Sequence, residues 1–155
     1  MSNTTTQSTA SAASTKSAGS FVKITGIVIA VIGAIMFIGG ASTWILVQTS
    51  LADERITVAE DADWFAGQEV NGPFTAYSEA MIIEKHALEG SGGKTYAELD
   101  REDPARASVM NGSFLRASLF TSVLAFGVSA MAMGLGIVQV LGGLALTKVG
   151  KTIDA

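Results

Sequence analysis

The feature that most constrains this chain is an apolar run from Ala117 to Thr147 that contains no Asp, Glu, Lys, Arg or His. At about 1.5 Å of rise per helical residue, this run is longer than the roughly 30 Å hydrocarbon core of a bilayer. A helix satisfies its backbone hydrogen bonds internally, as a segment that crosses lipid must. Ile24 to Val47 is a second uncharged run with the length of a span. The sequence therefore predicts an all-α membrane protein built on a two-transmembrane-helix hairpin with a small, mostly helical extracytoplasmic loop domain.

These two runs divide the chain into five predicted segments. They are a disordered Ser/Thr/Ala-rich tail (1–20), transmembrane helix 1 (21–48), an acidic helical loop (49–113), transmembrane helix 2 (114–147) and a short basic tail (148–155). The first tail has no large apolar side chain after Met1, so it buries too little surface to offset its ordering entropy. A cleaved signal peptide ending near Ala52 is the alternative, but the apolar run is about twice the usual length of a signal core.

Charge predicts the orientation of the hairpin. Between Asp53 and Arg116 there are 13 acidic and 6 basic residues, whereas the two ends of the chain carry four lysines and one acid. Basic flanks stay in the cytoplasm. We therefore predict a multi-pass protein of a bacterial plasma membrane, with both termini cytoplasmic and the loop extracytoplasmic. The formal net charge of −4 gives no electrostatic footprint for nucleic acid.

Both runs carry a face of small residues. In the second run the face is Ser118, Ser122, Ala125, Ser129, Ala132, Gly136, Gln139 and Gly143. Such faces let helix backbones approach closely in lipid, where no hydrophobic force drives helices together. The predicted helix-packing residues are Gly26, Ala30, Gly33, Gly40, Ser122, Ser129, Gly136 and Gln139, with the Gln139 amide hydrogen bonding across the interface. Whether these faces pack against each other or against another subunit is open at this point.

The loop contains two helix starts. Pro73 favours the first position of a helix that ends at Gly90, and Pro104 predicts a helix that continues into the second span. Thr95 to Glu98 matches a capping box. The predicted contacts with a partner or with the membrane surface are the aromatic residues Trp64, Phe65, Phe74 and Tyr77.

The residues that commonly carry chemistry do not form a recognisable site. His86 is the only histidine and there is no cysteine, which excludes a two-His metal site and a thiolate site. Gly93-Lys94-Thr95 lacks the earlier glycine of a phosphate-binding loop, and the acidic clusters lack the spacing of a calcium loop. The spans contain no ionisable side chain that could form an ion path. We expect no catalytic, cofactor-binding or metal-binding residues, no cofactor, no nucleotide or nucleic acid partner, and no enzyme activity.

The segment from Gly93 to Gly127, GKTYAELDREDPARASVMNGSFLRASLFTSVLAFG, resembles a group of small two-span membrane proteins of actinobacteria. The resemblance extends from the first span onward and implies a bacterial plasma membrane. Some members carry the label of an aromatic ring-opening dioxygenase, which implies iron held by two His and a carboxylate. Because His86 is the only histidine, the residues of this chain contradict that label.

The function that we expect is that of a non-catalytic accessory or structural subunit of a larger membrane-protein complex, respiratory or cell-envelope. It would pack through its small-residue faces and contact its partner through the outer helices, with membrane lipid around the spans. Two alternatives remain open: an envelope lipid- or ligand-binding module that uses the loop, and a self-assembling pore or transport component lined by Ser and Thr of the second span.

Overall fold

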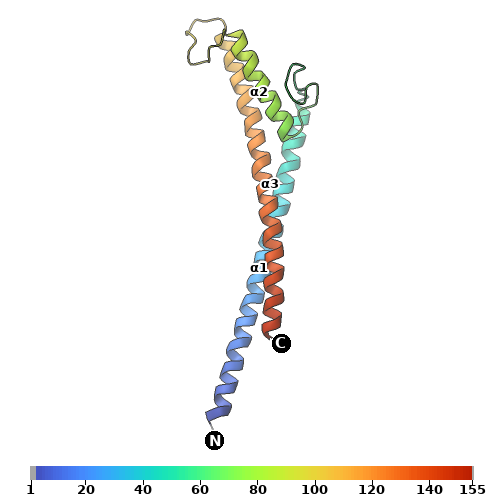
Figure 1. Ribbon diagram of the computed structural model, residues 1–155, viewed down its shortest axis with the longest axis vertical. Helices are drawn as coiled ribbons and strands as arrows, with labels where there is room; N and C mark the ends of the chain where they lie inside the picture. Colours follow the sequence, from blue (N-terminus) through green and yellow to red (C-terminus); the bar gives the residue numbers. More distant parts are fainter. Residues whose placement is uncertain (1–2, 155) are drawn as a thin grey trace. The chain divides into compact units, whose positions relative to one another are not determined.

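The computed structural model describes the backbone of residues 3–154 and the side chains of residues 18–154. It contains three helices, α1 (Asn3–Asp53), α2 (Pro73–Gly90) and α3 (Arg106–Asp154) (Figure 1). Two of them, α1 from Ala18 onward and α3, are long and apolar enough to cross a membrane. Residues 3–154 contain no β-strand, only an isolated antiparallel bridge between Thr57 and Glu69. The prediction of an all-α chain with two long apolar helices is thus confirmed.

Both predicted helix starts lie where local chemistry favours them. Gly72 is the N-cap of α2, and its N–H donates to Thr75 Oγ1 at 3.2 Å. Before α3, the Asp103 carboxylate accepts the N–H of Ala105 at 2.8 Å. The helix that starts after Pro104 continues without interruption through the second apolar run.

The predicted tail, residues 1–20, overlaps the beginning of α1. The backbone is helical from Asn3, whereas the side chains up to Ser17 lie outside the described residues. Once a helix exists, each further residue adds a hydrogen bond without a new nucleation step. No Pro or Gly interrupts the sequence before Gly19, so the span can extend backward as a helix.

The chain forms two compact units. The seam unit comprises Met1–Ala41 and Met131–Ala155, and the loop unit comprises Ser42–Ala130. In the seam unit α1 and α3 run antiparallel, because Gly19 lies against Gly150 and Gly33 against Gly136.

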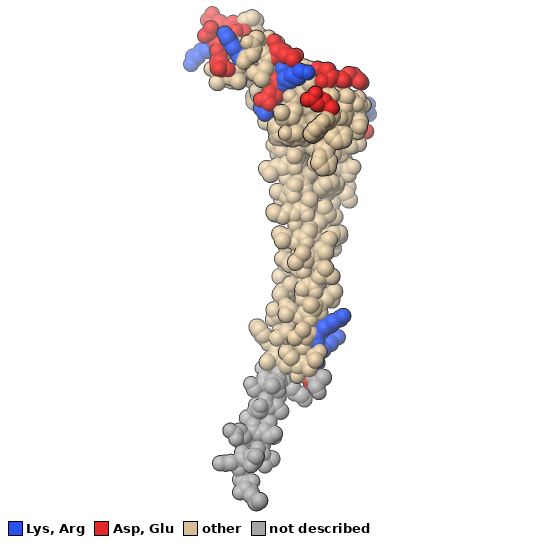
Figure 2. All heavy atoms as spheres, in the orientation of Figure 1, with Lys and Arg blue, Asp and Glu red and all other residues tan. Residues whose placement is uncertain are grey.

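The loop unit has the larger side-chain core. Its buried members come from the end of α1, the following segment, α2 and the first half of α3: Leu51, Val58, Val70, Ala76, Ala80, Leu119 and Phe126. The segment between α1 and α2 folds back on itself, since Val58 N–H donates to Gln68 O at 2.9 Å and Val70 N–H to Ile56 O at 2.8 Å. Figure 2 shows the Asp, Glu, Lys and Arg side chains of this unit gathered on α2 and on the segments that flank it.

Candidate functional site: a glycine seam and an exposed aromatic face

The closest helix contact in the seam unit is made by opposed glycines. A Cβ atom added to Gly33 would lie 2.6 Å from Gly136 O, and one added to Gly26 would lie 2.6 Å from Gly143 O. Carbon atoms do not approach backbone oxygens so closely, so these positions accept no side chain without a shift of the helices. The absence of a side chain is therefore what allows the two backbones to touch.

The contact repeats every seven residues on both helices. Gly19, Gly26 and Gly33 of α1 face Gly150, Gly143 and Gly136 of α3, and we call these six residues the glycine seam. A spacing of seven residues is slightly shorter than two helical turns, which favours a left-handed crossing. Sequence reasoning missed Gly19 and Gly150, although the seven-residue spacing extends to both.

The other predicted packing residues divide between the two units. In the seam unit Ala30 lies against Gly143, and Gly40 is buried. In the loop unit Ser129 is buried and Ser122 is half-buried. The hydroxyl of Ser129 donates to Ala125 O of its own helix at 2.8 Å, and that of Ser122 donates to Ser118 O at 3.2 Å. Both serines thus satisfy their hydroxyls locally and act as small residues.

Gln139 lies in the seam beside Gly33. A Cβ on Gly33 would come within 2.8 Å of the Gln139 Cβ. The buried Gln139 Oε1 accepts no hydrogen bond from the described residues, so the hydrogen bond of Gln139 across a helix interface stays a prediction. The close glycine contact brings Gly33 opposite the Cβ of Gln139, where α1 carries no side chain that could donate to the amide oxygen.

The second feature is an exposed aromatic face on the loop unit. Helix α2 buries mainly small or polar residues (Thr75, Ala76, Ser78, Glu79, Ala80 and Ile82). Its two aromatic side chains are exposed: Phe74 is 72% exposed and Tyr77 44%. Trp64 is 70% exposed and Phe65 38%. The four aromatic residues singled out from the sequence therefore lie on or beside α2 with much of their surface uncovered.

Two buried polar groups of α2 fix the segment that carries Trp64. The Glu79 carboxylate accepts the N–H of Ala59 at 3.0 Å, and the Ser78 hydroxyl donates to Trp64 O at 2.5 Å. Sequence reasoning did not identify Glu79, because nothing local distinguishes it from the solvated acids nearby. These bonds place the Trp64 backbone beside the second turn of α2.

Ion pairs attach the C-terminal half of α2 to its neighbours. Asp61 Oδ2 lies 2.8 Å from His86 Nε2 and 3.7 Å from Lys85 Nζ. The hydrogen bond from His86 lowers the pKa of Asp61 below its usual value, and the charges of His86 and Lys85 act in the same direction. Arg116 at the start of the second apolar run pairs with Glu84 at 2.8 Å. His86, the only histidine, therefore links α2 to the segment before it through Asp61.

Among residues with described side chains, no group of three or more His, Asp or Glu could hold a metal ion. No protein-family model, curated protein or solved structure matches the chain.

Proposed function

We propose that the chain is a non-catalytic accessory subunit of a larger bacterial membrane complex, in which two spans form a hairpin and the segment between them lies outside. The observation that best supports the hairpin is the glycine seam. The most closely packing faces of α1 and α3 are occupied by each other at Gly26–Gly143 and Gly33–Gly136. The seam thus holds the two spans of the hairpin together. A partner would then contact the loop unit and the faces of the spans that point away from the seam.

The loop unit has a polar surface that suits such a partner. It carries 13 acidic and 6 basic residues between Asp53 and Arg116. Exposed ion pairs are weakened by salt. A partner held by this acidic surface is expected to carry a basic outer surface and to dissociate as the ionic strength rises.

Co-purification tests the proposal. The tagged chain is expressed at its native level, extracted in mild detergent at low salt, and its companions are identified by mass spectrometry. A tagged two-span protein of unrelated sequence serves as the control. We expect a defined, stoichiometric complex that is lost at high salt. Recovery of the chain alone at low salt would contradict the proposal.

A second candidate function, recognition of an envelope lipid or other apolar ligand, is favoured by one observation. A groove of about 480 Å³ lies between α2 and residues 62–64, lined by Ala62, Asp63, Trp64, Tyr77, Ser78, Met81, Ile82 and Lys85. Trp64→Ala should then weaken the retention of co-extracted lipid, with Trp44→Phe as the matched control. Equal lipid retention by both variants would exclude this function.

A further inference from the structure

Three large side chains of α2 are exposed, although the same helix buries Ile82 in a packed unit. Phe74, Tyr77 and Met81 are 72%, 44% and 41% exposed, while Ala76 and Ala80 of the same helix are fully buried. Transfer of such apolar surface out of water is favourable. A helix that buries alanine and exposes phenylalanine to water loses this favourable free energy of transfer. We therefore expect the exposed face to lie against a non-aqueous neighbour.

The position of α2 identifies that neighbour. The Tyr77 ring packs edge-on against Phe120 of α3, with ring centroids 5.9 Å apart. Phe120 belongs to the uncharged run that begins at Ala117, just past the Arg116–Glu84 ion pair. The first turns of α2 therefore lie beside the uncharged part of α3, on the apolar side of its last outer charge.

Charge changes sharply along α2. Its first two turns, from Pro73 to Ser78, contain no charged residue, whereas its C-terminal half contains Glu84, Lys85, His86 and Glu89. An apolar beginning and a charged end within one helix match the change of polarity across the surface of a bilayer.

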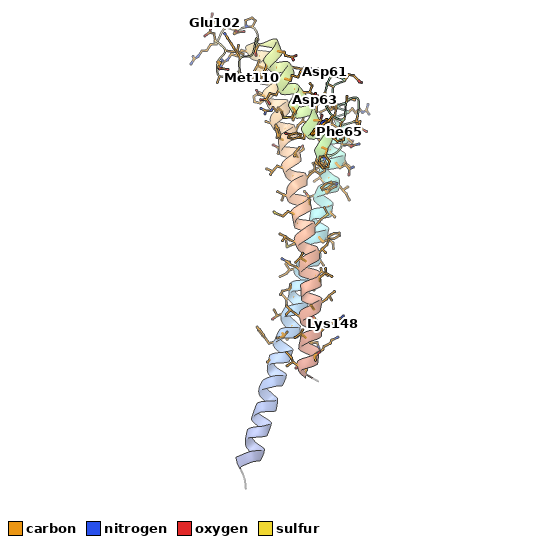
Figure 3. The ribbon with its side chains drawn as sticks, viewed as in Figure 1. Asp61, Asp63, Phe65, Glu102, Met110 and Lys148 are labelled. Carbon is orange, nitrogen blue, oxygen red and sulfur yellow. The ribbon has the colours of Figure 1, made fainter. Side chains whose placement is uncertain are left out.

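The segment before α2 follows the same gradient. Asp61 pairs with His86 in the charged half, whereas the Trp64 carbonyl bonds to Ser78 near the apolar end. Figure 3 shows Asp61, Asp63 and Phe65 one after another along α2, with Phe65 nearest to the end of α1. Asp61 is thus held at the charged end of α2, and the Trp64 backbone is held near its apolar end.

From these observations we infer that Trp64, Phe74 and Tyr77 lie in the boundary between headgroups and acyl chains of the outer leaflet, and that α2 and the segment before it rest on the membrane surface. Trp and Tyr are enriched at this depth because their rings have an apolar body and a polar edge. The inference rests on the proposed membrane insertion of α1 and α3, and it requires no protein partner.

The two tryptophans of the chain allow a direct test. In the Trp44→Phe variant of the full-length protein, all tryptophan emission comes from Trp64. The purified variant is reconstituted into phosphatidylcholine vesicles whose lipids are brominated either near the headgroup or near the end of the acyl chain. We expect Trp64 emission to be quenched more strongly by the shallow bromines than by the deep ones, and to be shielded from aqueous iodide.

A second variant supplies the control. In the Trp44→Phe, Trp64→Phe, Tyr96→Trp protein, the single tryptophan replaces Tyr96, whose ring is 37% exposed and lies 4.0 Å from the Arg106 guanidinium. Its emission should be quenched by iodide and unaffected by bromolipid. If Trp64 behaves like the tryptophan at position 96, the inference is wrong.

The same experiment separates the inference from the proposed function. Bromolipid quenching is measured without any partner, so it can succeed when no complex co-purifies. Conversely, if Trp64 becomes shielded only after the co-purified partner is added, the surface is a protein contact and the inference fails while the proposed function stands. Retained size-exclusion behaviour and thermal stability of each variant ensure that a negative result reflects position rather than misfolding.

Discussion

The seam unit and the loop unit bring helices together in opposite ways. In the seam unit the contact is made by missing side chains: the backbone oxygen of Gly136 lies where a Cβ of Gly33 would be. In the loop unit the contact is made by large side chains, as in the edge-on pair of Trp44 and Phe126 with ring centroids 4.7 Å apart. The seam should therefore be damaged by adding atoms, and the loop unit by removing them.

The difference lies in the chemistry of the two contacts. In the glycine seam no large side chain separates the helices, so the attraction comes from close backbone packing. In the loop unit Val58 and Val70 are almost completely enclosed, so burial of apolar side chains stabilises the contact.

The largest expected effect comes from removing the central side chain of the loop unit. Phe126 is 1% exposed and packs against Trp44. Phe126→Ala should lower the free energy of unfolding by about 3–5 kcal/mol, through lost burial and the cavity left behind. SDS-driven unfolding in mixed micelles, followed by tryptophan emission, measures it. Leu124→Ala, at a position 67% exposed, is the matched control and should change little. Equal losses in both variants would show that Phe126 is not a core residue.

The next effect comes from adding one methyl group to the seam. In Gly143→Ala the new Cβ would lie 2.6 Å from Ala30 N and 2.8 Å from Ala30 Cβ, so the helices must separate. We expect a loss of about 1–3 kcal/mol, the usual cost of overpacking. Spin labels on cysteines introduced at Val28 and Leu141 would report a larger interhelical distance.

Its control is the neighbouring glycine. A Cβ on Gly142 meets nothing within 4 Å. Gly142→Ala should be neutral or stabilising by up to about 1 kcal/mol, because alanine favours the helix. The comparison between the units would break down if Gly142→Ala were as harmful as Gly143→Ala.

The smallest effect concerns the exposed ion pair of the loop unit. The pKa of Asp61 is lowered mainly by its hydrogen bond to His86. A lowered pKa in the folded state gives stability that is present above the unfolded pKa and lost as the pH falls through the folded value. His86→Ala should raise the pKa of Asp61 and reduce this acid-induced loss. NMR titration of the side-chain carboxyl carbon would detect it, with Glu98, whose pKa is lowered by Thr95, unchanged as the reference.

Local signals in the sequence were sufficient for the bounds of α2 and for the start of α3. Helix starts and ends depend on the backbone chemistry of proline and glycine. Helix α2 begins at Pro73 and ends at Gly90, and α3 begins two residues after Pro104. The Thr95–Glu98 capping box forms its bond, with Thr95 N–H donating to Glu98 Oε2 at 2.8 Å, but it closes a turn and starts no helix. A cap stabilises a first turn; continuation depends on the residues that follow.

Long-range features could not be predicted in the same way. The bridge between Thr57 and Glu69 lies in a segment without alternating hydrophobicity, and it is held in place by Glu79 and Ser78 of a later helix. The aromatic face of α2 has helical spacing typical of a core, yet the buried face is the one with alanines. Which of two faces is covered depends on the shape of its neighbours, and that information is not local.

The even spacing of the glycine seam has a further consequence for how the hairpin can misassemble. If α3 slid along α1 by seven residues, about 10.5 Å of helix, Gly33 would meet Gly143 and Gly26 would meet Gly150. Glycine would still face glycine, so the seam sets the separation of the helices but tolerates slippage between equivalent registers. The correct alignment must come from side chains that do not recur at this interval, such as Gln139 beside Gly33.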